Sequence, residues 1–227
     1  MGLTNGSPNI KSVYIGCMKK TFVLVVLFVL PIVAYLFFAS GVTNFGRLPS
    51  LKEGIMEIPL NSGNPMFSEK ISVLGFLGKN VEGRKGNAFN LNQKIYKRFH
   101  EFDDFQFLMV VPKGTEVAVS NLKKELSNLD ETDKWNFAFL DDQDITRLFE
   151  SLGTDKKLES DLSSPFVFIV DKQLHLRGRN NDEDEGFKYG YNTASVADLN
   201  NKMVDDVKII LAEYRMARKE NNLQGKN

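Results

Sequence analysis

The apolar and polar positions of residues 70–217 predict one domain in which strands and helices alternate. Short apolar runs, of the kind found in buried strands, cover four segments: 71–77, 105–111, 135–140 and 166–170. Between these runs, apolar residues recur every three or four positions, which is typical of amphipathic helices. This alternating order predicts a mostly parallel sheet with helices on both faces.

The apolar run at 166–170 is followed by a polar turn and the alternating sequence Leu174-His175-Leu176-Arg177. This pattern predicts an antiparallel hairpin that completes the sheet. Pro165 stands at the start of the hairpin's first strand, where a residue without a backbone N–H does least harm to a sheet. After the hairpin, residues 178–193 are expected to form a long polar loop.

Residues 21–39 carry no charge and would span about 28 Å as a helix, close to the thickness of a membrane's hydrocarbon core. Lys19 and Lys20 precede the stretch and Arg47 is the first basic residue after it, so the positive-inside rule predicts a cytoplasmic N-terminus. A buried core helix would normally show a polar face, and residues 37–40 lack the small-x-small site of a cleaved signal peptide. We therefore expect a single-pass anchor in the cytoplasmic (inner) membrane, with an extracytoplasmic, periplasmic domain.

Five segments are expected along the chain. They are a short cytoplasmic N-terminus (1–20), a transmembrane helix (21–39), a linker (40–69), a folded domain (70–217) and a polar tail (218–227). The linker is expected because its Pro, Gly, Ser and Asn residues favour an extended tether. Residues 55–60 within it could add a short edge strand.

Charge and cysteine content exclude several function classes. Lys plus Arg and Asp plus Glu number 29 each, and no basic cluster is interleaved with aromatic residues, so we expect no nucleic-acid partner. The single cysteine, Cys17, precedes the apolar stretch and leaves residues 18–227 without a thiol. An intrachain disulfide, a cysteine-based zinc site and a thiol nucleophile are thereby excluded.

The order of elements over residues 70–215 resembles a thioredoxin-like domain. The extra helix–strand piece and the N-terminal anchor resemble the Sco/SenC family of copper-binding assembly factors for cytochrome oxidase. Two sequences carry this similarity: the turn Val111-Pro112-Lys113-Gly114-Thr115 and the strand end Phe168-Ile169-Val170-Asp171. The resemblance implies a three-layer α/β fold with a terminal antiparallel hairpin, and a role with a protein partner in respiratory-complex or envelope assembly.

The resemblance also shows what is missing. The family's Cys-x-x-x-Cys pair belongs in the loop after the first core strand, here residues 78–87, and its ligand histidine falls at about Ser163 or Ser164. Serine, lysine and glycine cannot replace a thiolate as redox nucleophile or as a soft ligand for Cu(I). We therefore expect a redox-inactive binding or scaffolding module, not an enzyme, with no cofactor. Its degenerate active-site position would comprise Gly78, Lys79, Asn80, Gly83, Arg84, Lys85, Gly86, Ser164 and Pro165.

Pro165 also lies where thioredoxin-like domains carry a cis-proline that faces the redox cysteines. The resemblance therefore implies a cis Ser164–Pro165 bond packed beside the loop 78–87. An ordinary trans proline is the alternative, since only a small share of X-Pro bonds in folded proteins is cis.

A metal carrier or an enzyme that uses non-cysteine groups is the alternative function. It would use Lys79, Arg84 and Lys85 to gather an anion, or His100 and His175 with methionine ligands. A glycine-rich loop before a helix can cradle a phosphate, but the sequence matches neither of the common phosphate-binding motifs.

The acidic run Asp182-Glu183-Asp184-Glu185 lacks the alternating ligand spacing and the fixed glycine of an EF-hand loop. A solvated loop is therefore expected there and not a calcium site. Further on, Ser195 and Asp198 resemble the capping pair of a last helix.

Overall fold

The computed structural model describes residues 22–33, 46–59, 65–129 and 131–224. It divides into two units, Met1–Asn44 and Phe45–Asn227. In the first unit, residues 22–33 are helical and all of them are exposed. The expected cytoplasmic segment 1–20 and positions 21 and 34–39 of the expected span lie outside the described residues. Over the part of the chain that is described, no helix is both long and apolar enough to cross a membrane.

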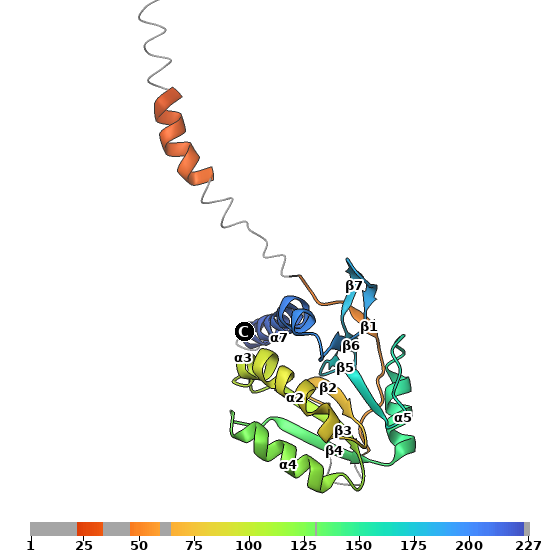
Figure 1. The fold of residues 1–227 in the computed structure, drawn as a ribbon. Coiled ribbons are helices and arrows are strands. Elements are labelled where there is room, and N and C mark those ends of the chain that lie inside the picture. The colour runs from red at the N-terminus through yellow and green to blue at the C-terminus, as the bar shows by residue number, and fades with distance from the viewer. Residues whose placement is uncertain (1–21, 34–45, 60–64, 130, 225–227) are drawn as a thin grey trace, which may run out of the picture. The chain divides into compact units, whose positions relative to one another are not determined.

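The second unit contains a mixed sheet with the strand order β1-β6-β5-β2-β3-β4, and β9 pairs with β5 (Figure 1). The strands are β1 Ser50–Lys52, β2 Ile71–Leu77, β3 Phe105–Pro112, β4 Trp135–Leu140, β5 Ser163–Val170, β6 Leu176–Arg177 and β9 Tyr191–Asn192. Strands β2, β3 and β4 are parallel. The hairpin β5–β6 is antiparallel and pairs with the other edge of β2.

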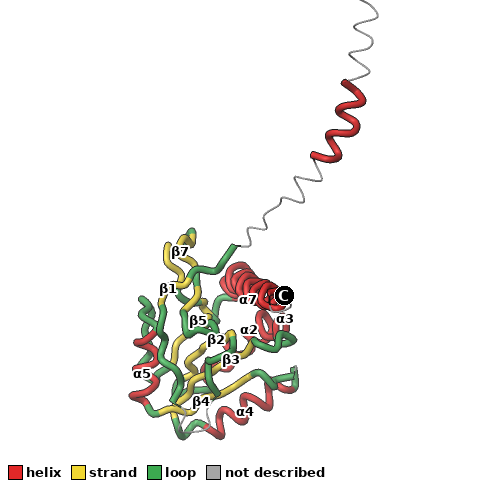
Figure 2. Tube along the Cα trace, turned by 180° about the vertical axis from the view of Figure 1, so that it is seen from behind, coloured by secondary structure: helices red, strands yellow, loops and turns green. Residues whose placement is uncertain are grey.

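Helices cover both faces of this sheet (Figure 2). They are η2 Glu82–Arg84, α2 Lys85–Leu91, the π-helical η3 Asn92–Tyr96, α3 Lys97–Phe99, α4 Glu116–Ser127, α5 Asp142–Ser151, α6 Val196–Asp198, the π-helical η4 Leu199–Met203 and α7 Val204–Gln224. One core, here called the α7-side core, contains buried residues of α2, η3, α3, α4, η4 and α7. A second core, here called the α5-side core, contains the buried residues of α5. Alternate residues of β3 belong to one core and to the other, so the two cores lie on opposite faces of the sheet.

The predicted strand–helix alternation is confirmed. All seven residues of β2 and all eight of β3 are buried, as expected for strands covered on both faces. A parallel strand–helix–strand unit beside an antiparallel hairpin that leads into a final helix is the thioredoxin-like arrangement, and β4 is the additional parallel strand. The chain therefore has a mixed α/β, thioredoxin-like fold. The last helix reaches Gln224, and so continues into the expected tail 218–227.

The described part of the expected linker belongs to the folded domain. Strand β1 pairs with β6, and Ile55, Ile58 and Phe67 are buried in the α5-side core. Leu48 is buried in the α7-side core instead, so the chain passes round the edge of the sheet at β1 (Figure 1). The tether expected over 40–69 therefore differs from the structure at residues 46–59 and 65–69, and the edge strand lies at Ser50–Lys52 instead of 55–60.

The long polar loop expected at 178–193 is also different. Strands β7 Arg179–Asp182 and β8 Gly186–Lys188 form a separate two-stranded sheet, and β9 joins the main sheet. The acidic run comprises the last residue of β7, Asp182, and the turn 183–185 that leads to β8. Asp182 is buried and is therefore not part of a fully solvated loop.

Candidate functional site

The degenerate active-site position lies at the carboxyl end of β2, where Gly78 starts the turn toward α2 with a φ of 68°. A Cβ at Gly78 would lie 2.6 Å from the carbonyl oxygen of Asp161 and 2.7 Å from the backbone nitrogen of Ser163. The backbone N–H of Lys79 donates to the same Asp161 oxygen at 2.8 Å. The turn is thus pressed against the segment that leads into β5, and only glycine combines this φ with this space.

Residues 78–87 form less of a loop than expected. The 3₁₀ turn η2 begins at Glu82 and leads directly into α2 at Lys85. Gly83 donates its N–H to Asn80 Oδ1 at 3.0 Å, which fixes the start of this turn. A Cβ at Gly86 would meet nothing within 4 Å. No neighbouring group therefore comes close enough to Gly86 to require glycine at this position.

Arg84 is the centre of a polar cluster that joins this turn to β5. Its Nε and Nη2 donate to Ser163 Oγ at 3.1 and 2.8 Å, and Nη2 lies 2.5 Å from Glu159 Oε2. Ser163 Oγ in turn donates to Asp161 Oδ1 at 2.6 Å. We call Arg84, Glu159, Asp161 and Ser163 the Arg84 cluster. The guanidinium, hydroxyl and carboxylate groups of the cluster form hydrogen bonds and ion pairs with one another. They lie at the position where the resemblance places thiols and a ligand histidine.

The cluster favours the ionised form of one carboxyl group. Burial raises the pKa of Asp161, but hydrogen bonds from Ser163 and the positive charge of Arg84 outweigh it, so the pKa lies below its ordinary value. Asp161 is therefore a fixed anion at neutral pH and is poorly suited to exchange protons with a substrate.

The expected cis Ser164–Pro165 bond is wrong, because every peptide bond of the described residues is trans. Strand β5 already begins at Ser163, which is in register with Leu77 of β2. The chain is therefore extended through Pro165 and forms no tight turn there. The Pro165 carbonyl accepts from both the N–H and the hydroxyl of Thr193, at 2.8 and 2.7 Å.

Free space at this position is a cavity of about 10 Å³, room for about one water molecule. The cavity is lined by residues of β2, η2, α2, β3 and β5 and by the segment after β9: Gly75, Phe76, Leu77, Arg84, Asn87, Ala88, Leu91, Met109, Ser164, Val167 and Thr193. Of the residues expected at the degenerate active-site position, Arg84 and Ser164 line this cavity. This cavity is too small for an organic substrate.

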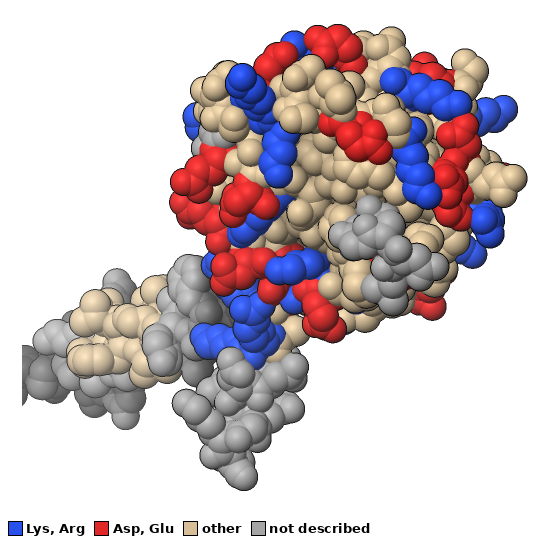
Figure 3. Space-filling view, turned by 90° about the horizontal axis from the view of Figure 1, so that it is seen from below, with Lys and Arg blue, Asp and Glu red and all other residues tan. Residues whose placement is uncertain are grey.

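The basic residues of the alternative function do not gather round a common anion. Lys79 Nζ lies 2.7 Å from Asp142 Oδ2, and Lys85 Nζ lies 2.5 Å from Glu125 Oε1, whereas Arg84 contacts Glu159. The hydrogen bond that Lys85 donates to Glu125 is the main cause of the raised pKa of Lys85. Charges of opposite sign likewise adjoin one another over much of the domain face in Figure 3.

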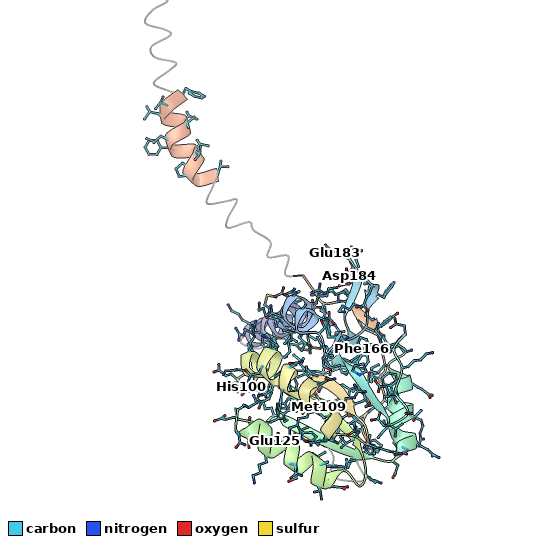
Figure 4. All side chains as sticks on the ribbon, viewed as in Figure 1. His100, Met109, Glu125, Phe166, Glu183 and Asp184 are labelled. Atoms are coloured by element: carbon cyan, nitrogen blue, oxygen red, sulfur yellow. The ribbon has the colours of Figure 1, made fainter. Side chains whose placement is uncertain are left out.

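The two histidines lie in separate environments. The His100 ring stacks on Tyr96 with centroids 5.4 Å apart, and Figure 4 shows His100 beside α3, away from Met109 in the sheet. His175 Nδ1 lies 3.5 Å from Asp171 Oδ2 in the turn between β5 and β6. Within the described segments, no group of three or more His, Cys, Asp or Glu side chains could hold a metal ion.

A buried charge cluster around Arg177 was missed by the sequence reasoning. Its Nε donates to the Leu48 carbonyl at 2.8 Å, Nη1 to Asp171 Oδ2 at 2.9 Å and Nη2 to Glu213 Oε2 at 2.7 Å. Arg177 and Asp171 are both buried. The available signal was the placement of these two charges beside apolar strand residues, where an unpaired charge would be costly.

Three solved structures are similar to this chain. They are a proposed electron transport protein from Aquifex aeolicus VF5 (16% identity, 63% of this chain and 83% of that chain, TM-score 0.44), the thioredoxin domain of a thiol-disulfide oxidoreductase from Bacteroides vulgatus (16%, 60% and 91%, 0.38) and a thiol:disulfide interchange protein from Bacteroides sp. (17%, 57% and 78%, 0.38). No protein-family model and no curated protein matches the chain. Since the three TM-scores lie below 0.5, the fold assignment rests on the strand order, and the Sco/SenC resemblance stays a prediction.

Proposed function

We propose that this protein is a membrane-tethered, redox-inactive thioredoxin-like module that acts by binding a protein partner. The observation that carries the proposal is the Arg84 cluster, which closes the carboxyl end of β2 with groups that satisfy one another. Residues 18–227 contain no cysteine, so the domain has no thiolate to serve as redox nucleophile or copper ligand.

The sequence of residues 21–39 supports the membrane tether, because the stretch is uncharged and its described part, 22–33, is helical. Leu48, which is buried in the domain, follows Ala39 by nine residues. An extended chain of that length reaches about 30 Å. A partner is therefore expected at the membrane surface or within an integral membrane complex.

The absence of redox chemistry is tested with the full-length protein in detergent. Reduction of insulin by dithiothreitol should proceed at the same rate with and without the protein, and Cu(I) should not bind at one equivalent in competition with a chelator. The variant Cys17→Ser is the matched control, since it removes the only thiol in the chain. Turnover or stoichiometric copper binding that persists in Cys17→Ser would overturn the proposal.

The tether and its orientation have their own test. The protein should remain in the membrane after carbonate washing, and protease added to spheroplasts should digest the C-terminal domain while an N-terminal tag stays protected. Release by carbonate, or digestion of the tag, would contradict the membrane part of the proposal. Neither result would affect the redox-inactive part, which the insulin and copper measurements decide separately.

A further inference from the structure

The hairpin β7–β8 is attached to the rest of the domain through charged side chains. Of residues 179–188 only Asp182 and Lys188 are buried. The one large apolar side chain of the hairpin, Phe187, is 54% exposed. Figure 4 shows Glu183 and Asp184 at the outer end of this hairpin. Apolar burial, the usual source of docking energy, therefore contributes little here.

One set of ion pairs joins the hairpin to η4 and α7. Lys202 Nζ lies 2.7 Å from Asp182 Oδ1 and 2.6 Å from Asp184 Oδ2. Arg179 Nε lies 2.7 Å from Asp206 Oδ2, and its Nη2 donates to the Lys202 carbonyl at 3.1 Å.

A second set joins the other strand of the hairpin to the segment after α5 and to α6. Glu185 accepts from Lys156 Nζ at 2.9 Å and from Lys188 Nζ at 2.5 Å. Lys188 Nζ also lies 3.0 Å from Asp198 Oδ1 and 5.6 Å from the centre of the Tyr191 ring. These two sets are the charged groups that face the hairpin from α6, η4, α7 and the segment after α5.

We infer that β7–β8 is a flap that opens independently of the domain core when its ion pairs are screened by salt or neutralised by acid. Each set contains side chains that salt can reach, since Arg179, Glu185 and Lys202 are partly exposed although Asp182, Asp206 and Lys188 are buried. Salt strengthens or leaves unchanged the apolar burial that holds the main sheet. An isolated two-stranded hairpin is only marginally stable, so the flap loses its internal protection once it undocks. Opening would also uncover Asp206 and Tyr191, which contact the flap through Arg179 and Lys188.

The direction of the acid effect follows from two carboxyl groups. Burial raises the pKa of Asp182, but hydrogen bonds from Lys202 outweigh it and hold the pKa below its ordinary value. Burial is likewise outweighed at Glu185, whose pKa is lowered by Lys188 and Lys156. Folded-state pKa values below the unfolded ones stabilise the docked state above about pH 5, and this stabilisation is lost as the pH falls below about 4.

Hydrogen–deuterium exchange of the full-length protein in detergent tests the flap. At neutral pH, about 1 M NaCl should speed amide exchange in residues 180–187 about tenfold relative to low salt, while β2, β3 and β5 keep their protection. Lys202→Met should produce the same selective loss at low salt, because it removes both carboxylate contacts of η4. Equal responses of flap and core amides, or no response of the flap, would overturn the inference.

The matched control is Lys208→Met. Lys208 lies on α7, and within the part of the chain that the structure describes its ion pair is with Asp205 at 3.1 Å. The variant therefore removes the same charge without touching the flap. Its exchange pattern should equal that of the unmodified protein, and faster flap exchange in Lys208→Met would refute the ion-pair explanation. If Lys202→Met does not fold, the salt series on the unmodified protein decides the question.

Discussion

Arg84 donates two hydrogen bonds to the hydroxyl of Ser163, a residue 79 positions further along the chain. The pair ties the first helical turn after β2 to the first residue of β5. These two elements meet at the position where the resemblance places catalytic groups. Because the contact joins two segments that are far apart in the sequence, its loss should be measurable as a loss of stability.

Arg84→Met should lower the free energy of unfolding by about 1 to 3 kcal/mol, because it leaves Ser163, Asp161 and Glu159 without their common cation. Urea denaturation followed by circular dichroism measures the change. Arg147→Met is the control, since Arg147 is largely exposed and, among the described residues, forms its ion pair with Asp144 on its own helix. That variant should change stability by less than about 0.5 kcal/mol. Equal effects of the two variants would contradict a role for the Arg84 cluster.

Gly78→Ala should lower the free energy of unfolding by about 3 kcal/mol or prevent folding, because the new Cβ combines a positive φ with a 2.6 Å approach to backbone oxygen. Gly86→Ala should instead stabilise the protein by about 0.5 to 1 kcal/mol, since Gly86 lies in α2 with nothing within 4 Å of its Cβ position. Thermal unfolding of both variants measures the contrast. A neutral Gly78→Ala would show that the turn is not held against β5.

Phe67→Ala should lower the free energy of unfolding by about 3 to 5 kcal/mol, because Phe67 is fully buried in the α5-side core. The neighbouring Met66 is 36% exposed, and Met66→Ala should cost less than about 1 kcal/mol. Denaturant midpoints of the two variants provide the comparison. A small effect of Phe67→Ala would restore the interpretation of residues 65–69 as a tether.

Alkaline titration should reveal the buried Tyr191. Burial, followed by the charge of Asp206 and the hydrogen bond to its Oδ2, raises the pKa of Tyr191 well above its ordinary value. The folded state thus keeps a proton that the unfolded chain loses above about pH 10, so stability falls as the pH rises beyond that value. Stability measured between about pH 8 and 11 should decline less steeply in Tyr191→Phe. An identical slope would show that Tyr191 ionises freely in the folded protein.

The strands of the main sheet could be predicted from the sequence because burial on both faces leaves an uninterrupted apolar run. The segment before β2 could not, since Ile55, Ile58 and Phe67 stand in short apolar groups that glycines, prolines and polar residues interrupt. Their burial depends on a face of the sheet that α5 covers only in part. No local pattern in the sequence shows that this part of the sheet is left for them to cover.

For the candidate site, the sequence predicts which segments adjoin but not which side chains pair. The strand order alone brings residues 78–87 next to the start of β5, and the structure places them there. The partners of Arg84 and the docking of Asp182 were not predictable, because a charged residue beside a turn resembles a solvated one until its distant partner, such as Lys202, is known. The trans bond at Pro165 accompanies the start of β5 at Ser163, three residues before the apolar run begins.

Arg177 contacts both the Leu48 carbonyl and Glu213 of α7. These two contacts cannot form at the same stage of translation. Leu48 is among the first residues of the domain to be made, while Glu213 belongs to its last helix. Chains that end before α7 lack Glu213 and the apolar residues of α7 that share a core with Leu48. The first segment of the domain to be synthesised therefore acquires its full set of contacts only after the final helix has been translated.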